Sequence, residues 1–400
     1  MNKETKKGKK YMEWLYVLLV IGVLALGGVS IFVLPQRTYS ESENRYLTKV
    51  PHISAGGVLS GEVQRDLTEA AGDQFPGREQ WLQIAVTDQY LLYHREINGV
   101  YIGKDHYLFD KKLGSDLPEK NYRTNLGYVT AMKEATDSDV SVMLIPTPGT
   151  LLKEELPTRA VLYDPTPYEE LGGQICEADS VRWVQTRDAL EHANRDSFDR
   201  LYFYTDHHWT THGAYVGAAT YLETQNIQVK AEEAFEIQTA RDDFYGTLYS
   251  RVAGLPAAQA DVLELPQALP KKLQIESDSP PADALGVNGE RSMPELDGIY
   301  DLSKLDVKDK YAVYFGGNYG KITVKNPEAE GKGSLLVFKD SYANSMVPYL
   351  LDEYEQITMI DLRYYNESVP QLVAQGWDEV LVCYEMSNFI NDRNLFKLIR

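Results

Sequence analysis

The pattern of hydrophobic and polar positions begins with an apolar run, residues 14–34, that contains no charged side chain. A helix of this length and composition can cross the hydrocarbon core of a bilayer. Five lysines stand among the first ten residues, and such positive charge stays cytoplasmic, which places everything after Pro35 outside. A cleaved signal peptide is the alternative, but the run is long for one and no clear small-x-small cleavage site follows it. We therefore expect an uncleaved single-pass anchor in the cell membrane.

Beyond the anchor, helical periodicity and short apolar runs alternate. Helices are predicted near residues 57–72, 77–95, 117–136 and 179–193. Buried strands are predicted at residues 140–145, 201–204, 335–338, 357–362 and 379–384. Strands that alternate with helices predict an α/β fold with a parallel sheet. Residues 230–330 lose this rhythm, so they are expected to form an insertion of hairpins and loops between two halves of one sheet.

Composition removes some functions from consideration. The net charge is −19, whereas nucleic-acid binding requires a basic surface. Only two cysteines occur, which indicates stability from a hydrophobic core rather than from disulfides. Cys383 lies within the apolar run VLVCY and is expected to be buried, although pairing with Cys176 stays open.

Two polar stretches follow predicted strands and carry residues suited to acyl transfer. The first is TDHHWT, residues 205–210, and the second is KDSYANS, residues 339–345. Asp206 and His208 share one side of an extended segment, so the acid can orient the imidazole, while His207 should point the other way. Ser341 lies where a strand turns into a helix, and N–H groups at that position can stabilise an oxyanion. Because both stretches end strands, they are expected to meet at one edge of the sheet.

Two other interpretations compete with this one. His208 and His212 have the spacing of two zinc ligands on a helix, but Trp209 stands where the HEXXH motif needs glutamate. No second cluster of ligands appears, so we expect neither a metal nor a cofactor. In the purely structural interpretation, Ser341 caps a helix and the histidines are polar residues at a strand end.

These residues resemble the signature of the bacterial DHHW protein family, which is related to SGNH-like acetyltransferases that O-acetylate exopolysaccharides such as alginate. TDHHWT followed by THGAY and the piece VFKDSYANS carry the most specific part of the likeness. Further matching pieces are SESENRYL, DQFPGR, VYIGKDHYLF, FYGTLYSR and YFGGNYG. They cover most of the chain after the anchor.

The resemblance implies an SGNH-hydrolase-like parallel sheet flanked by helices, in circularly permuted order. Residues 140–145 and 201–204 would then be its last two strands and the C-terminal strands its first three. The implied domains are a basic tail with the anchor, a helical lead-in, two halves of a catalytic domain and the β-containing insertion between those halves. In chain order they comprise residues 1–35, 36–95, 96–229, 230–330 and 331–400, with the insertion fourth.

The resemblance also implies a Ser341–His208–Asp206 triad that forms an acyl-serine intermediate. The N–H of Ser341 is the expected first oxyanion donor, and Tyr384, Asn388 and Asn344 are candidates for the second donor or for substrate binding. The implied function is extracytoplasmic O-acetyl transfer or acetyl-ester hydrolysis on a cell-surface polysaccharide, with a membrane partner that supplies acyl groups. The alternative is a catalytically degenerate carbohydrate-binding or scaffold protein of an envelope assembly complex.

Overall fold

The computed structural model describes residues 3–40, 43, 45–196, 200–277 and 298–400. The chain divides into two compact units, which are described separately. The smaller unit comprises residues 1–94 together with 252–256, and the larger unit comprises residues 95–251 and 257–400.

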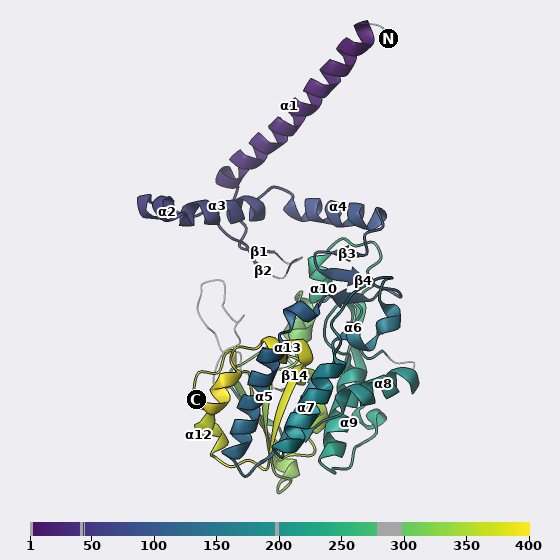
Figure 1. Ribbon diagram of the computed structural model, residues 1–400, viewed down its shortest axis with the longest axis vertical. Helices are drawn as coiled ribbons and strands as arrows, with labels where there is room; N and C mark the ends of the chain where they lie inside the picture. Colours follow the sequence, from purple (N-terminus) through teal and green to yellow (C-terminus); the bar gives the residue numbers. More distant parts are fainter. Residues whose placement is uncertain (1–2, 41–42, 44, 197–199, 278–297) are drawn as a thin grey trace. The chain divides into compact units, whose positions relative to one another are not determined.

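The smaller unit begins with the apolar helix α1 (Lys3–Val33). Its segment Tyr11–Val33 is long and apolar enough to cross a membrane, with a mean hydropathy of 2.6. A signal sequence has the same length and composition, so these properties alone do not separate it from an anchor. The described residues of this unit also form three further helices and a short strand pair (Figure 1): α2 (Ala55–Ser60), α3 (Glu62–Asp73), α4 (Arg78–Leu91), β1 (Tyr39–Ser40) and β2 (Arg45–Tyr46).

The motifs SESENRYL and DQFPGR are joined by a polar network within this unit. Asp73 accepts hydrogen bonds from Arg45 Nη1 at 3.0 Å and from the Thr48 N–H at 2.8 Å. The hydrogen bond from Arg45 is the main cause that lowers the pKa of Asp73. Arg78 forms a second ion pair with Glu43. These two motifs therefore have a structural explanation, because they tie the chain after α1 to the end of α3.

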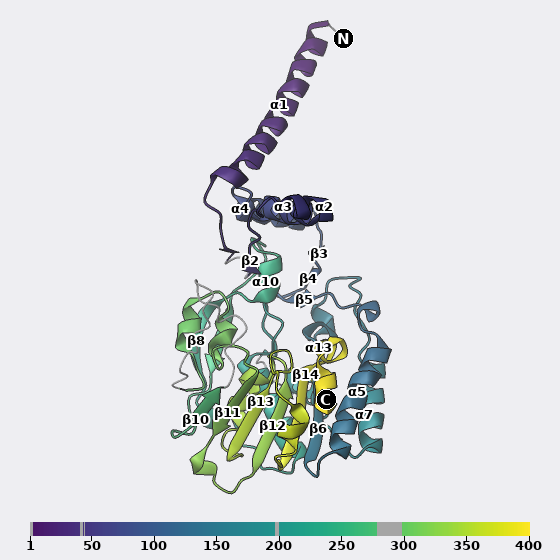
Figure 2. The ribbon, with the colours of Figure 1, turned by 90° about the vertical axis from the view of Figure 1, so that its left-hand side faces the viewer.

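The larger unit is built on a seven-stranded sheet in the order β10–β11–β13–β12–β14–β6–β7. Strands β13, β12, β14, β6 and β7 pair in parallel, whereas β10 and β11 add an antiparallel edge (Figure 2). The bounds are β6 Asp139–Ile145, β7 Arg182–Trp183, β10 Gln274–Ser277, β11 Lys321–Lys325, β12 Ser334–Lys339, β13 Gln356–Ile360 and β14 Glu379–Glu385. The fold is thus α/β with a mixed, mostly parallel sheet.

Alternating side chains of the central strands fill two cores, one on each face of the sheet. Leu335 and Val337 of β12 enter one cluster, and Leu336 and Phe338 enter the other. The first cluster is covered by helices α9 (Thr211–Thr224) and α11 (Ala343–Met346). The second is covered by α5 (Glu119–Glu134), α7 (Thr166–Ala178), α12 (Val369–Val373) and α13 (Met386–Asn391). Strand β12 is thus buried on both faces, as a parallel sheet between helical layers requires.

The structure corrects two expectations about this sheet. Residues 201–204 form no strand of it, and only Tyr202 makes an isolated bridge, to Trp209. The strand next to β6 is instead the two-residue β7, within the stretch 179–193 that was expected to be helical, followed by α8 (Thr186–Asp196). Strands β10 and β11, within residues 230–330, extend the sheet. Apolar content alone could not distinguish a strand from a buried loop at 201–204, since both are equally buried.

The described part of the larger unit also contains two small sheets. Strands β3 (Glu96–Ile97), β4 (Val100–Ile102) and β5 (Leu108–Asp110) form one, and β8 (Gln238–Phe244) and β9 (Asp261–Leu265) form the other. Helix α10 (Thr247–Arg251) lies between β8 and β9 in sequence. Cys176 and Cys383 are both buried and free, and they belong to the clusters on opposite faces of the main sheet.

Candidate active site

The TDHHWT segment is an irregular loop that the β8–β9 hairpin holds in place. Asp261, which is fully buried on β9, accepts hydrogen bonds from the N–H groups of Tyr204 and Thr205 at 2.7 and 2.8 Å. It also accepts a bond from the Thr205 hydroxyl at 2.6 Å. That hydroxyl in turn accepts a bond from the Gly246 N–H at 3.0 Å. A buried carboxylate thus fixes the backbone immediately before the acid–histidine pair.

Asp206 and His208 lie together because the chain turns between them. The His208 N–H donates to Asp206 Oδ1 at 3.0 Å, and His208 Nδ1 donates to the same oxygen at 2.5 Å. An Asp side chain that bonds to the N–H two residues later forms a local turn. The two side chains were expected to lie on one side of an extended strand. They do lie together, but because the backbone turns at Asp206 and not because it is extended. This contact fixes the imidazole tautomer, leaving Nε2 without a proton.

The free nitrogen of His208 faces Ser341. The distance from His208 Nε2 to Ser341 Oγ is 2.7 Å, so the hydroxyl can donate to the nitrogen. Ser341 follows β12 and precedes α11, and Asp340 anchors this connection to the neighbouring strand. The Asp340 carboxylate accepts bonds from the N–H groups of Tyr342 and Glu385 at 3.0 and 2.9 Å. In the described part of the chain, the Ser341 N–H has no hydrogen-bond acceptor.

Aromatic side chains hold His208 and the Ser341 turn in position. The ring of Tyr311 stacks on the His208 imidazole, with centroids 3.7 Å apart and an interplanar angle of 9°. Its hydroxyl donates to the Ser341 carbonyl at 3.2 Å. Trp209 Nε1 donates to the Tyr342 carbonyl at 3.1 Å and to Ser345 Oγ at 2.8 Å. The stack and the indole bonds restrict the rotamers of both the imidazole and the serine turn.

Gly246 and Thr247 contact the Asp206 carboxylate and hold it in position. The Thr247 N–H donates to Asp206 Oδ2 at 2.7 Å, and the Thr247 hydroxyl donates to it at 3.0 Å. A Cβ at position 246 would stand 2.2 Å from Asp206 Cβ, so only glycine fits there. Burial by itself raises the pKa of Asp206, but the neighbouring histidines and these hydrogen bonds outweigh it, and the pKa lies below its ordinary value. The carboxylate is therefore ionised at neutral pH.

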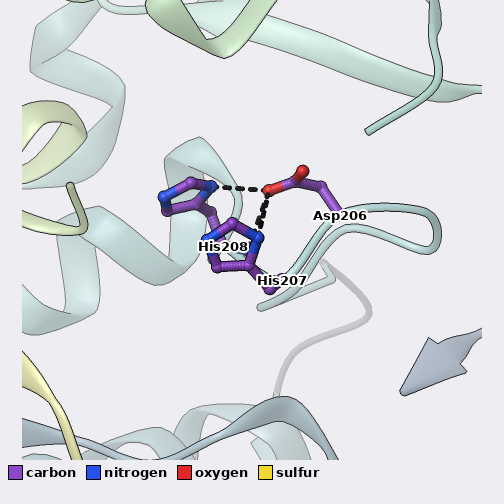
Figure 3. A group of neighbouring side chains, drawn as sticks. All are labelled: Asp206, His207 and His208. Carbon is purple, nitrogen blue, oxygen red and sulfur yellow. Dashed lines mark hydrogen bonds and ion pairs between the residues drawn. The ribbon is translucent and has the colours of Figure 1, made fainter. Parts of the chain in front are cut away.

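His207 lies beside His208, which corrects the expectation that it points away. Figure 3 shows both imidazoles near the same carboxylate oxygen, and the two ring centroids are 3.9 Å apart. His207 Nδ1 donates to Thr247 Oγ1 at 2.7 Å. Desolvation, together with the charge on His208, lowers the pKa of His207 to about 4. A neutral His207 completes the network that holds Thr247 against Asp206.

A metal ion fits this arrangement poorly. Ligand atoms of Asp206, His207 and His208 lie within 4.8 Å of one another. However, the 2.5 Å contact between His208 Nδ1 and Asp206 Oδ1 is a hydrogen bond, and both ligands of one zinc ion would stand about 3 Å or more apart. His212, the other candidate ligand, instead bonds to Glu232 at 2.7 Å. The residues present thus match a proton relay better than a zinc site.

The three candidates for a second oxyanion donor occupy different places. Tyr384 is buried in the cluster on the face opposite Cys383 and packs edge-on against Phe389. Asn388 Nδ2 donates to Asp340 Oδ2 at 2.8 Å. Asn344 Oδ1 accepts from Lys339 Nζ at 2.7 Å, and Asn344 Nδ2 donates to Asn318. No hydrogen bond among the described residues links any of the three side chains to Ser341. The role of each as a donor stays a prediction.

A recess of about 50 Å³ adjoins the site. His207, Tyr342 and Asn388 are among its lining residues, as is Glu385. Glu385 is buried, and desolvation raises its pKa to about 7, although it accepts hydrogen bonds from Ser387. The recess reaches the residue after Ser341 and provides space for a small substrate group.

Sequence reasoning missed the side chains that support this network: Gly246, Thr247, Asp261, Tyr311 and the Lys339–Asn318 pair. Most of them lie in residues 230–330, which the pattern presented as an irregular insertion. The available signal was the likeness of FYGTLYSR and YFGGNYG to family motifs, since Gly246, Thr247 and Asn318 stand inside these pieces.

A comparison with protein-family models now adds to the geometry. Residues 186–360 match the model described as DHHW protein, and this range contains Asp206, His208 and Ser341. The part of the chain that carries the candidate site is thus similar to the DHHW family. No curated protein matches the chain.

Three solved structures are similar to this chain. A DHHW family protein from Eubacterium siraeum aligns with a TM-score of 0.57 at 20% identity, over 76% of this chain and 95% of that one. PatB1 of Bacillus cereus, solved with a sulfonyl adduct, aligns with a TM-score of 0.56 at 20% identity, over 75% of this chain and 100% of that one. The O-acetyltransferase domain of Pseudomonas putida AlgJ has a TM-score of 0.45 at 13% identity, over 74% and 93% of the two chains.

Proposed function

We propose that this protein is a polysaccharide O-acetyltransferase or acetylesterase that works through an acetyl-Ser341 intermediate. The observation that carries the proposal is the continuous hydrogen-bonded chain from Asp206 through His208 to Ser341, with distances of 2.5 and 2.7 Å. Such a chain is the arrangement by which a serine hydroxyl becomes a nucleophile at neutral pH. The relation of the DHHW family to SGNH-like acetyltransferases supports the choice of acetyl groups.

The first half-reaction forms the acyl-enzyme. Ser341 Oγ attacks the carbonyl carbon of an acetyl ester while its proton passes to His208 Nε2. The carbonyl oxygen becomes an oxyanion, which the Ser341 N–H stabilises. As the tetrahedral intermediate collapses, the bond to the donor oxygen breaks and that oxygen takes the proton from His208. Asp206 stabilises the transient imidazolium and keeps its ring oriented.

The second half-reaction transfers the acetyl group to an acceptor hydroxyl. His208 Nε2 takes the proton of a sugar hydroxyl, or of water in the esterase reaction. The hydroxyl oxygen attacks the acyl carbon, and Ser341 Oγ leaves with the proton from His208. Transfer and hydrolysis thus use the same groups, and they differ in how well the acyl-enzyme excludes water.

The proposal places the α/β unit outside the cell, with α1 as an uncleaved anchor. The lysines that precede the apolar segment favour this orientation. Acetyl donors are scarce outside the cell, so a membrane protein that passes acyl groups across the bilayer is the proposed partner. The sheet is proposed to be circularly permuted, because the serine turn after β12 follows the acid–histidine pair in sequence.

The test is detection of the intermediate by intact mass. The full chain in detergent is incubated with p-nitrophenyl acetate, and an acetyl adduct is expected on the wild type but not on Ser341→Ala. Ser303→Ala, in an exposed position, should keep the adduct. Ester cleavage that continues undiminished in Ser341→Ala would refute the nucleophile. Wild-type protein that binds carbohydrate but never forms the adduct would favour a degenerate binding protein.

A further inference from the structure

A pair of tyrosines borders the acid–histidine segment on the side of α10. The ring centroids of Tyr245 and Tyr249 are 4.5 Å apart, and both side chains are half-buried. Tyr245 directly precedes Gly246, which adjoins Asp206. The Tyr249 N–H donates to the Thr205 carbonyl at 3.1 Å. The pair is therefore fixed to the same backbone that positions Asp206.

Lys308 brings a positive charge to this pair. Its Nζ lies 5.0 Å from the ring centroid of Tyr249 and 6.0 Å from that of Tyr245. Lys308 stands three residues before Tyr311, whose ring stacks on His208. Burial lowers the pKa of Lys308, as does the charge of Lys310, and the nearby Asp206 carboxylate acts on it in the opposite direction. The charge of Asp206 therefore acts electrostatically on the Lys308 ammonium group.

Among the described residues, this ammonium group has no anionic partner in an ion pair. Lys310, two residues on, pairs with Asp243 at 3.7 Å. Desolvating a cation without an ion pair costs free energy, which a bound anion would offset. Contact with two aromatic faces recovers part of this cost.

We propose that Lys308, Tyr245 and Tyr249 form a subsite for a negatively charged sugar residue of the acceptor polysaccharide. This inference rests on the proposed function and specifies its substrate class. The aromatic rings contact the sugar, and the ammonium group pairs with its carboxylate or phosphate. Because the subsite adjoins the backbone that positions Asp206, it holds the acceptor near the acid–histidine pair and leaves the chemistry of the acetyl donor unchanged.

The experiment separates binding from catalysis. Calorimetry on the full-length Ser341→Ala protein in detergent measures Kd for trigalacturonate, glucose 6-phosphate and the neutral trisaccharide maltotriose. Lys308→Met, which removes the charge and keeps an unbranched side chain one atom shorter, should weaken binding of the anionic probes about tenfold, as expected for one charge-assisted contact. Binding of maltotriose should not change. The loss of affinity that each anionic probe suffers in Lys308→Met shows whether the ammonium group pairs with a carboxylate, a phosphate or both.

Two variants complete the design. Lys308→Arg keeps the charge and should retain most of the affinity, and Lys304→Met removes a lysine outside the subsite and should match the parent. Equal affinity in Lys308→Met, equal loss for neutral and anionic probes, or no binding of either anionic probe would overturn the subsite. If the protein forms acetyl-Ser341 but does not bind the anionic probes through Lys308, only the subsite is refuted. If it binds them but never forms acetyl-Ser341, only the proposed reaction is refuted.

Discussion

Replacing Asp206 by Asn tests the hydrogen-bonded relay most sharply, because it changes one atom of the side chain. Oδ1 of Asp206 accepts from the N–H and Nδ1 of His208, and Oδ2 accepts from the N–H and hydroxyl of Thr247. An amide has only one accepting oxygen, so it can serve only one of these two pairs.

Both orientations of the amide damage the site. If its oxygen faces Thr247, its NH₂ faces His208, whose Nδ1 must then accept. The proton moves to Nε2, which can no longer take the proton of Ser341. If the oxygen faces His208, the Thr247 N–H loses a buried partner at a cost of about 1–3 kcal/mol. In that case, the imidazolium also loses its counter-charge.

The expected loss can be set by analogy with other serine enzymes. The corresponding substitution in a Ser-His-Asp triad lowers kcat by roughly 10⁴, which is about 5.5 kcal/mol of transition-state stabilisation. We expect Asp206→Asn to lower kcat for p-nitrophenyl acetate by about 10³–10⁴ with little change in KM. The exposed Asp242→Asn makes the same charge change outside the site and should match the wild type. A folded Asp206→Asn protein with kcat within tenfold of the wild type would refute the relay.

Two further substitutions test the contact of Gly246 with the Asp206 carboxylate and the buried side chain of Glu385. Gly246→Ala places a Cβ 2.3 Å from Asp206 Oδ2, so the carboxylate must move. If the move breaks one hydrogen bond to the charged carboxylate, worth about 1.5–3 kcal/mol, kcat should fall at least tenfold in the same assay. Gly127→Ala, with nothing within 4 Å, is the control and should keep full activity. The raised pKa of Glu385, about 7, favours its protonated form in the folded state. Its stabilisation is therefore complete at low pH and is lost as pH rises through 7, by at most about 3 kcal/mol. Urea unfolding at pH 5 and pH 8 measures this loss. The free energy of unfolding should fall less between the two pH values in Glu385→Gln than in the wild type, and an equal fall in both proteins would contradict the assignment.

The sequence was informative where local patterns determine structure. Apolar runs predicted β6, β12, β13 and β14, and the strand-to-helix turn at Ser341 was found as expected. The meeting of Ser341 with Asp206 and His208 could be anticipated because both stretches follow apolar segments. The reason was only partly correct, since residues 201–204 are a buried loop and not a strand of the sheet.

The parts that could not be predicted depend on contacts between distant residues. Nothing local indicates that Asp261 binds the backbone of Thr205, because an acid after an Ala-rich loop is usually exposed. The orientation of His207 likewise depends on Thr247, which lies 40 positions later. Alternation along a strand predicted the opposite orientation, and the turn at Asp206 removed the regular backbone on which that rule depends.

The position of β14 has a consequence for how the protein is made. This strand lies between β12 and β6, although β6 precedes it by more than half of the chain. During synthesis, the apolar β6 emerges long before the neighbour that will cover its edge. Closing such a long loop is slow. Until it closes, the unpaired apolar strand can pair with other chains and aggregate. We therefore expect the chain to refold slowly and to lose more protein to aggregation as its concentration rises.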